Sequence, residues 1–159
     1  MFYAGIGSRQ TPPPVLAEMT TLARDLSARG FTLRSGGALG ADSAFAAGSS
    51  RSQIFVPWPG YNGLPLIFPV LPAAYDLAAR YHPNWAACSR GARALHARNM
   101  HIMLGPSLDS PVSIVVCWTP GGAVTGGTGQ ALRVALDRGI PILNMATDSP
   151  SRLVLDSGR

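Results

Sequence analysis

The feature that most constrains the fold is the regular alternation of short apolar runs with segments of helical periodicity. Five runs have the length and composition of strands: FYAGIGSR, FTLRS, QIFVPW, SPVSIVVCW and IPILNM. The run SPVSIVVCW is apolar nearly throughout, which is typical of a parallel strand covered on both faces. Strands that alternate with helices predict an α/β fold with a mainly parallel sheet flanked by helices.

The segments between these runs carry the helical signal. Helices are expected over 11–30, 41–48, 73–82, 88–105 and 130–139. In the first of them, prolines stand at the entry, apolar residues recur at helical spacing, and a glycine follows the end. Residues 57–72 are rich in proline and aromatic side chains without periodicity, so we expect a long ordered loop of a kind often tied to a site.

The length of 159 residues suits one domain with a substantial hydrophobic core. We assign that domain to residues 1–146 and expect a loosely held polar tail over 147–159. No apolar run reaches the roughly 20 residues of a membrane span, and the amino terminus enters a strand without a signal peptide. We therefore expect a cytoplasmic protein without a membrane partner.

The cysteines and histidines show no familiar ligand spacing. Cys88 and Cys117 are too far apart in sequence for a close metal-ligand pair, and Cys117 ends an apolar strand, which indicates a buried thiol. His82, His96 and His101 fit no catalytic-triad spacing, and neither HExxH nor CxxC occurs. The sequence therefore predicts no metal site and no cofactor.

The basic residues are of one type. All 13 are arginine, and with eight acidic residues they give a net charge of +5. A basic protein favours an anionic partner such as a nucleotide, a nucleic acid or phosphate, and the planar guanidinium suits bidentate phosphate contacts. Biased codon usage is the alternative explanation for the arginines. The absence of lysine excludes a P-loop, whose lysine is obligatory.

Three turns rich in glycine and small residues follow expected strands: GIGSR, SGGALGAD and TPGGAVTGGTG. Ligands of parallel sheets bind beyond the carboxyl ends of the strands, so we expect the turns to converge on one crevice. Backbone N–H groups and a helix N-terminus would face an anion there. The residues expected to bind a phosphate or nucleotide are Gly7, Ser8, Arg9, Ser35, Gly36, Gly37, Gly40, Asp42, Arg98, Asn99, Gly126, Gly127, Thr128 and Gly129.

Several of these residues also have a structural interpretation. Asp42 stands in the first turn of an expected helix, where it could cap the helix, bind a ribose hydroxyl or a base amino group, or act as a catalytic carboxylate. Arg9 is either a phosphate ligand or an exposed turn arginine. The aromatic residues Trp58, Tyr61 and Trp118 could stack on a base or serve in packing.

In their order and spacing, four motifs resemble the SLOG superfamily of Rossmann-like domains: GIGSR, SGGALGAD, RNMHIM and GGTGQALRVALDRGIPILNM. The resemblance runs from about residue 3 to residue 145. The superfamily includes the DNA-processing recombination mediators (DprA/Smf) and the Lonely Guy, or lysine decarboxylase-like, nucleotide phosphoribohydrolases. The resemblance implies a single Rossmann-like domain that binds a nucleotide or a nucleic-acid strand.

The DprA-like side of the resemblance rests on SGGALGAD and RNMHI, which are similar to that family's SGxAxGID and RNRxI. DprA proteins bind single-stranded DNA, so this resemblance implies a crevice that holds the phosphates of single-stranded DNA or a nucleotide without chemistry of its own. It places at that crevice Ser8, Arg9, Ser35, Gly36, Gly40, Asp42, Arg98, Asn99 and Thr128.

Lonely Guy enzymes cleave the N-glycosidic bond of a nucleoside monophosphate with an arginine and a glutamate from PGGxGTxxE. Here Ala131 stands in place of that glutamate, and the adjacent glutamine cannot replace a carboxylate beside an oxocarbenium-like charge. If the protein is an enzyme, the resemblance leaves Asp42 and Arg98 as its catalytic residues. A nucleotide-signal sensor is the third alternative.

Many relatives complete their crevices with a neighbouring subunit. The resemblance therefore implies a homo-oligomer, and the apolar loop 64–71 is the contact that we expect.

Overall fold

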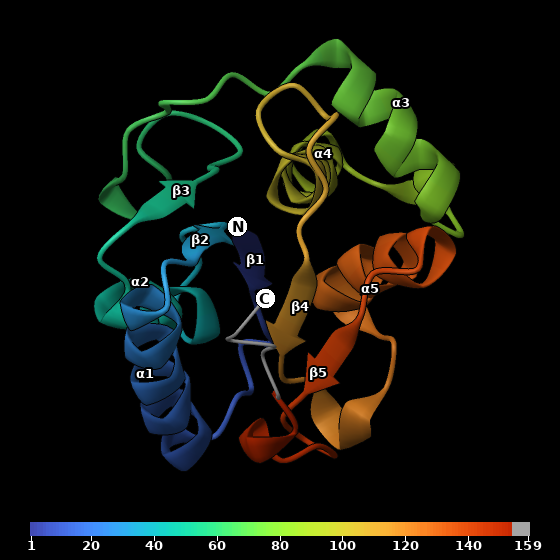
Figure 1. Ribbon diagram of the computed structural model, residues 1–159. Coiled ribbons are helices and arrows are strands. Elements are labelled where there is room, and N and C mark those ends of the chain that lie inside the picture. Colours follow the sequence, from blue (N-terminus) through green and yellow to red (C-terminus); the bar gives the residue numbers. More distant parts are fainter. Residues whose placement is uncertain (154–159) are drawn as a thin grey trace.

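The computed structural model describes residues 1–153, and within them five strands form one parallel sheet (Figure 1). The strands lie in the order β3-β2-β1-β4-β5. Every neighbouring pair is parallel. Their bounds are β1 (Phe2–Gly5), β2 (Thr32–Ser35), β3 (Ser52–Ile54), β4 (Ile114–Cys117) and β5 (Ile142–Asn144).

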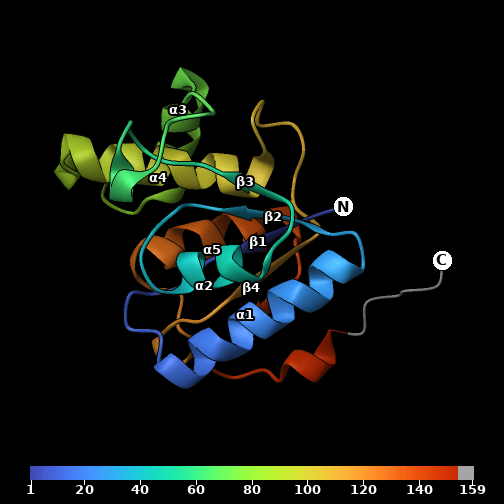
Figure 2. The same cartoon turned by 90° about the vertical axis from the view of Figure 1, so that its left-hand side faces the viewer.

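Helices cover both faces of this sheet (Figures 1 and 2). The helices α1 and α2 lie on one face, α4 and α5 lie on the other, and α3 packs against α4. No helix within residues 1–153 is long and apolar enough to cross a membrane. The bounds are α1 (Pro13–Ala28), α2 (Ala41–Gly48), α3 (Pro72–Tyr81), α4 (Arg90–Leu104) and α5 (Gly126–Arg138), with short 3₁₀ turns between them.

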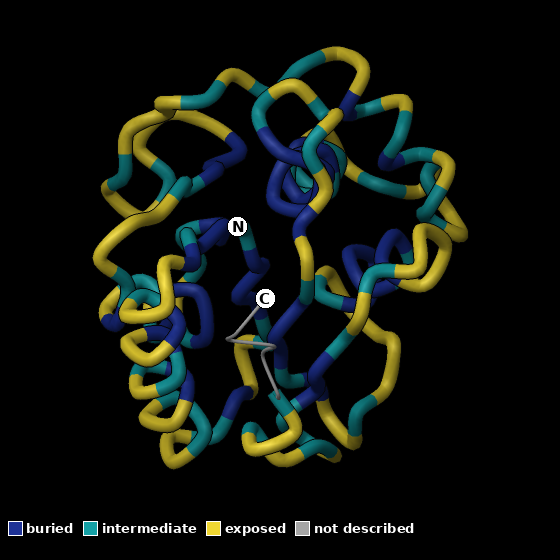
Figure 3. The backbone as a smooth tube through the Cα atoms, viewed as in Figure 1, coloured by how far each residue is buried: buried dark blue, intermediate teal, exposed yellow. Residues whose placement is uncertain are grey.

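The central strands are buried on both sides, because successive side chains of a strand point to opposite faces. Tyr3 packs in the cluster under α1 and α2, whereas Ala4 packs in the cluster with α4 and α5. Likewise, Val116 of β4 packs in the cluster under α1 and α2, and Val115 packs in the cluster with α4 and α5. Figure 3 shows this buried centre between exposed outer helix faces. Burial on both faces explains why the runs are apolar rather than alternating.

The topology provides one natural position for a ligand. From β1 the chain builds outward through β2 and β3, then returns to place β4 on the other side of β1. Ala4 of β1 therefore pairs with Val115 of β4, far apart in sequence. At such a switch point the loops after the two strands diverge and leave a crevice beyond their carboxyl ends.

The single α/β domain with a parallel sheet, consistent with a Rossmann-like fold, is confirmed, and so is the buried free thiol of Cys117. One helix start was wrong: α5 begins at Gly126, not at 130, because the Gly129 amide already donates to the Thr125 carbonyl at 2.8 Å. The strand expected over 53–58 is shorter, because its ladder with β2 ends at Ile54. Of the expected tail, 154–159 lie outside the described residues.

Candidate functional site

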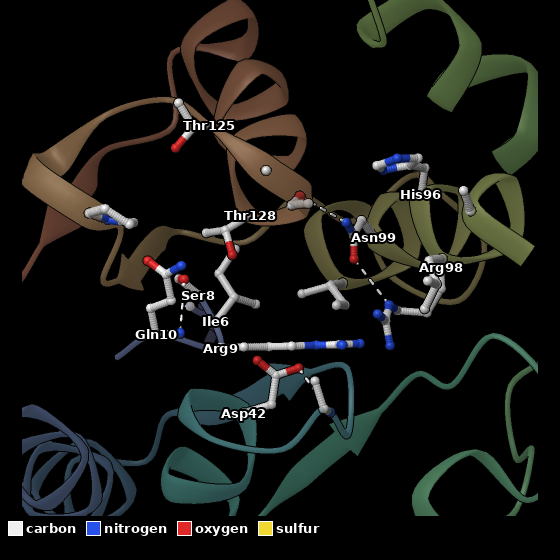
Figure 4. A pocket seen from close by; sticks show the side chains of 18 of the residues that line it. Ile6, Ser8, Arg9, Gln10, Asp42, His96, Arg98, Asn99, Thr125 and Thr128 are labelled. Carbon is white, nitrogen blue, oxygen red and sulfur yellow. Dashed lines mark hydrogen bonds between the residues drawn. The ribbon is translucent and has the colours of Figure 1, made fainter. Parts of the chain in front are cut away.

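A cavity of about 550 Å³ lies beyond the carboxyl ends of β1 and β4 (Figure 4). The turn after β1, the turn between β2 and α2, the turn before α5, and one face of α4 form its walls. The three glycine-rich turns thus meet around one space. The predicted site residues that line it are Gly7, Ser8, Arg9, Asp42, Arg98, Asn99, Gly126, Gly127 and Thr128.

The start of α5 opens onto this cavity. Thr125 precedes the helix in an extended conformation, its side chain makes no capping hydrogen bond, and no acidic residue stands in the first turn. Gly126 and Gly127 are exposed and Thr128 is half-buried. The first amides of a helix have no intrahelical acceptor, and they carry the positive end of the helix dipole. This wall therefore offers unsatisfied donors to an anion.

The turn after β1 brings a cation to the same space. The Ser8 amide donates to the Trp118 carbonyl at 3.0 Å, which ties the turn to the end of β4. Arg9 is exposed, makes no ion pair within residues 1–153, and extends across the cavity toward Arg98 (Figure 4). A Cβ on Gly7 would lie 2.6 Å from the Ala41 Cβ, so a glycine is needed for this turn to approach α2.

The turn between β2 and α2 is closed on itself. The Asp42 carboxylate, 5% exposed, accepts the Gly36 amide at 3.0 Å and the Ala38 amide at 3.3 Å through Oδ2. The Ser35 hydroxyl donates to the Gly5 carbonyl at 2.6 Å and so links β2 to β1. Asp42 therefore does not cap α2. Its carboxylate accepts amides of the preceding turn and so stabilises that turn.

The face of α4 connects two of the walls. Arg98 Nη1 donates to the carbonyls of Gly36 and Phe55, and its Nε donates to Asn99 Oδ1 at 3.0 Å. Asn99 Nδ2 in turn donates to the Gly127 carbonyl at 3.2 Å. Among residues 1–153, Arg98 Nη2 has no hydrogen-bond partner, so this guanidinium is fixed by its neighbours and still has a free donor. A Cβ on Gly36 would lie 2.6 Å from Arg98 Nη1.

The surroundings shift the pKa values of two titratable groups of the cavity, Asp42 and His96. Burial raises the pKa of the Asp42 carboxyl, while the Arg98 charge and the amides of Ala38 and Gly36 act in the opposite direction. Burial lowers the pKa of His96, whose Nδ1 lies 3.0 Å from Gln130 Oε1. The crevice contains two cations, the exposed Arg9 and the hydrogen-bonded Arg98, and one buried carboxyl group, that of Asp42.

Five predicted site residues do not line the main cavity. Ser35, Gly36 and Gly37 form the closed turn behind the wall, and Gly129 is buried against the Val124 backbone. Gly40 instead lines a smaller adjoining cavity, which it shares with Arg9, Leu39, Tyr61 and Asn62.

Sequence reasoning missed most of the α4 wall. Ala92, Leu95 and His96, which were not predicted, line the cavity from the same helix face as the predicted Asn99. The spacing of three, four and seven residues from Ala92 to the other three is the signal that could have identified this face. The other lining residues not predicted to bind phosphate are Ile6, Gln10, Ala38, Tyr61, Ile102, Pro120 and Thr125.

Of the aromatic candidates, Tyr61 alone lines the cavity. Its ring lies 5.5 Å from the Arg98 guanidinium and meets Trp58 edge-on at 5.5 Å. Trp118 packs against the core cluster under α1 and α2. The arrangement offers one ring to a base beside the arginines, backed by a second.

Comparison with known proteins identifies the fold. No protein-family model and no curated protein matches the chain. Among solved structures, the chain is similar to DNA processing protein A from Helicobacter pylori, reported in a study of that protein's single-stranded DNA binding mode. The TM-score is 0.60 with 19% sequence identity, over 99% of this chain and 73% of that chain. A likeness at this identity shows that the two chains share an α/β fold.

Proposed function

We propose that the protein binds single-stranded DNA, or a nucleotide, by its phosphate groups in the crevice between β1 and β4. The observation that carries this proposal is the convergence of Arg9, Arg98 and the open N-terminus of α5 on one cavity. Arginine forks and helix N-termini are both well suited to bind phosphate. The structural neighbour from Helicobacter pylori, which binds single-stranded DNA, supports the polynucleotide version.

Each part of the crevice has a role in this proposal. The amides of Gly126, Gly127 and Thr128 receive one phosphate, and Arg98 Nη2 donates to the same group or to its neighbour. Arg9 is exposed and extends across the opening, so it contacts the phosphate that enters or leaves the cavity. Tyr61 offers its ring to the attached base. The net charge of +5 favours association with a polyanion.

The experiment is fluorescence anisotropy with a labelled oligothymidylate of about 15 nucleotides, in competition with nucleoside mono-, di- and triphosphates, over a series of salt concentrations. Contact with several phosphates of a single strand gives a log–log salt slope of about −0.7 for each phosphate. A steep slope with weak competition by mononucleotides is the expected result. Tight, salt-insensitive binding of one mononucleotide would reject the DNA version in favour of a nucleotide site.

A matched pair of variants locates the site. Arg9→Gln removes a charge from the crevice, and Arg24→Gln removes the same charge from the exposed side of α1. We expect the first to weaken binding and the second to leave it within about twofold. Equal losses in the two variants would mean that the protein attracts DNA through its overall charge and not through this crevice.

An N-glycosidase acting on nucleoside monophosphates is the second candidate. It is favoured by the placement of the buried Asp42 carboxyl in the wall of the cavity, below Arg9 (Figure 4). Analysis of the products after incubation with nucleoside monophosphates decides the matter. Release of free base that is lost in Asp42→Asn would establish the enzyme, and unchanged nucleotide at full binding would leave a binding protein.

We also infer that the protein forms a homo-oligomer through loop 64–71. Leu66 and Ile67 in this loop are exposed, at 36% and 67% of their surface. Light scattering of the purified chain should give a mass above that of one copy, and Ile67→Asp should return it to the monomer. A monomeric mass at micromolar concentration would reject this contact.

A further inference from the structure

A second cluster of functional side chains lies where the 82–88 connection packs against α4. His82 directly follows α3, Cys88 directly follows a 3₁₀ turn (Trp85–Ala87), and His96 lies in α4. One ligand atom from each lies within 4.8 Å of the other two, and all three residues are half-buried. Neither the proposed phosphate contacts nor the N-glycosidase alternative uses this cluster.

We propose that His82, Cys88 and His96 form a zinc site, with water as the fourth ligand. Two imidazoles and a thiol are donors that zinc prefers, whereas calcium and magnesium take oxygen ligands. Tetrahedral zinc with its usual bond lengths places a sulfur and a nitrogen ligand about 3.6 Å apart. Cys88 Sγ lies 3.5 Å from His82 Nε2 and 3.7 Å from His82 Nδ1.

The second imidazole is oriented by its partner in α5. His96 Nδ1 lies 3.0 Å from Gln130 Oε1, and an amide oxygen can only accept, so Nδ1 carries the proton. The lone pair of the neutral ring is then on Nε2 and available to a metal. A hydrogen bond from the other ring nitrogen is the usual way in which proteins fix a metal-binding histidine. The rings of His82 and His96 are 4.7 Å apart.

The neighbouring side chains enclose one side of the cluster. The Trp85 ring stands 6.2 Å from the His82 ring and 6.4 Å from the His96 ring, and Arg93 lies over Trp85 and donates to its carbonyl at 3.1 Å. The half-burial of the three ligands leaves solvent access for a fourth ligand.

Zinc binding requires two rearrangements of protons and hydrogen bonds. The Cys88 thiol releases one proton and binds as the thiolate. His82 Nδ1 accepts the Asn84 amide at 3.0 Å. Binding zinc through Nε2 moves the ring proton to Nδ1, and binding through Nδ1 occupies the lone pair, so the Asn84 hydrogen bond is given up in both cases.

The site would connect α3, the 82–88 connection and α4. Because His96 also lines the crevice, zinc would fix the first half of α4, two residues before Arg98. The sequence pattern did not predict a metal site because the spacing of five and seven residues between ligands matches no common motif. The three residues come together only through the packing of α3 on α4.

The test uses the full chain without an affinity tag. Cobalt(II) titration should give the visible bands of a tetrahedral site and a thiolate-to-cobalt charge-transfer band that saturate at one equivalent, and zinc should abolish both. Cys88→Ser should remove the charge-transfer band, whereas Cys117→Ala, which removes the buried core thiol, should retain it. His82→Asn and His96→Gln should each weaken zinc affinity at least tenfold in competition with a chelator.

The cobalt spectrum of wild type alone reports the coordination geometry and the thiolate ligand, so it does not depend on whether a variant folds. Octahedral cobalt bands without a thiolate transition would overturn the proposal, and so would equal zinc affinity in wild type and Cys88→Ser. Binding of copper with no measurable binding of zinc would overturn the assignment of the metal. Loss of DNA binding in the crevice variants does not bear on these readouts, so the two proposals fail separately.

Discussion

The two glycine-rich turns on facing walls of the crevice use their backbone amides in opposite ways (Figure 4). In the turn from Ser35 to Asp42, a carboxylate of the turn itself accepts the amides of Gly36 and Ala38. In the turn that begins α5, neither an acidic residue nor a side-chain cap accepts the amides of the first turn. The first turn is buried at Ser35, Gly36 and Asp42 and exposed at Leu39, whereas the second is exposed at Gly126 and Gly127.

Glycine content alone therefore does not identify a ligand site. Both turns need glycine because another part of the chain approaches closely: a Cβ on Gly36 would meet Arg98, and a Cβ on Gly129 would meet the Val124 backbone. What separates them is the presence of an internal acceptor. A turn with its own carboxylate is complete as a scaffold, whereas a turn without one retains donors for an external anion.

The largest effect is expected when a carboxylate is added to the turn that begins α5, which has no acceptor of its own for its amides. Gly127→Asp should lower affinity for single-stranded DNA on the order of 100-fold, because a carboxylate opposes phosphate there and like charges in contact cost several kcal/mol. A Cβ at this position meets no other heavy atom within 4 Å. The melting temperature should stay constant or rise, since aspartate stabilises a helix N-terminus by about 0.3–1 kcal/mol.

The neutral control for this substitution is Gly127→Asn. It adds a side chain of the same size without the charge and should keep affinity within about tenfold of wild type. If aspartate and asparagine weaken binding equally, steric obstruction is responsible, and the distinction between open and closed turns loses its support.

The next largest effect concerns the closed turn. Asp42→Ala leaves the Gly36 and Ala38 amides without their acceptor, which should cost about 2 kcal/mol of unfolding free energy. Affinity of the folded variant for DNA should not fall, because the lost charge is negative. Urea unfolding and anisotropy measure the two quantities. A variant of unchanged stability that no longer binds would assign Asp42 to the ligand and not to the scaffold.

A smaller effect is expected at the mouth of the crevice. Arg9→Gln should weaken binding roughly tenfold and reduce the salt slope by about 0.7, the value for one lost phosphate contact of a single strand. Arg24→Gln on α1 should leave the slope unchanged. The slope of log affinity against log salt concentration is measured for both variants and for wild type. Equal slopes for Arg9→Gln and wild type would mean that Arg9 does not contact a phosphate.

The smallest effect is a pH dependence of stability. Burial raises the pKa of Asp42 in the folded protein, so its contribution is fully present below the unfolded pKa of about 3.9 and is lost as pH rises through the folded pKa. Relative to Asp42→Asn, wild type should therefore become less stable as the pH rises from 4 to 8. If the stability of wild type relative to Asp42→Asn instead increases as the pH rises, then Arg98 and the two amides lower the pKa of Asp42 by more than burial raises it.

Much of the fold followed from the sequence, because strand and helix periods are local properties. The run ending at Cys117 is apolar on both faces, and both its faces are indeed buried. The convergence of three turns could be anticipated from the rule on carboxyl ends of parallel strands. The start of α5 could not, because four residues with three glycines have low helix propensity. They form the first turn only as the N-terminus of a packed helix, with Gly126 in the left-handed region at a φ of 68°.

The residues of the site were predictable in part. The pattern indicated Arg9, Arg98 and Thr128 at the crevice but did not distinguish Gly36, which faces inward, from Gly127, which faces the cavity. That distinction depends on which amides Asp42 accepts, a question of three-dimensional geometry. The grouping of His82 with His96 likewise depends on long-range packing, which no local pattern encodes.

The phosphate site at the α5 N-terminus is tested most directly by the change in backbone amide resonances of the ¹⁵N-labelled chain during titration with an oligothymidylate. We expect the amide resonances of Gly126, Gly127 and Thr128 to shift strongly downfield, because these amides donate to a phosphate. Those of Gly36 and Ala38 should stay nearly constant, because Asp42 accepts both amides. Large shifts at Gly36 and Ala38 with a constant α5 N-terminus would contradict this phosphate site.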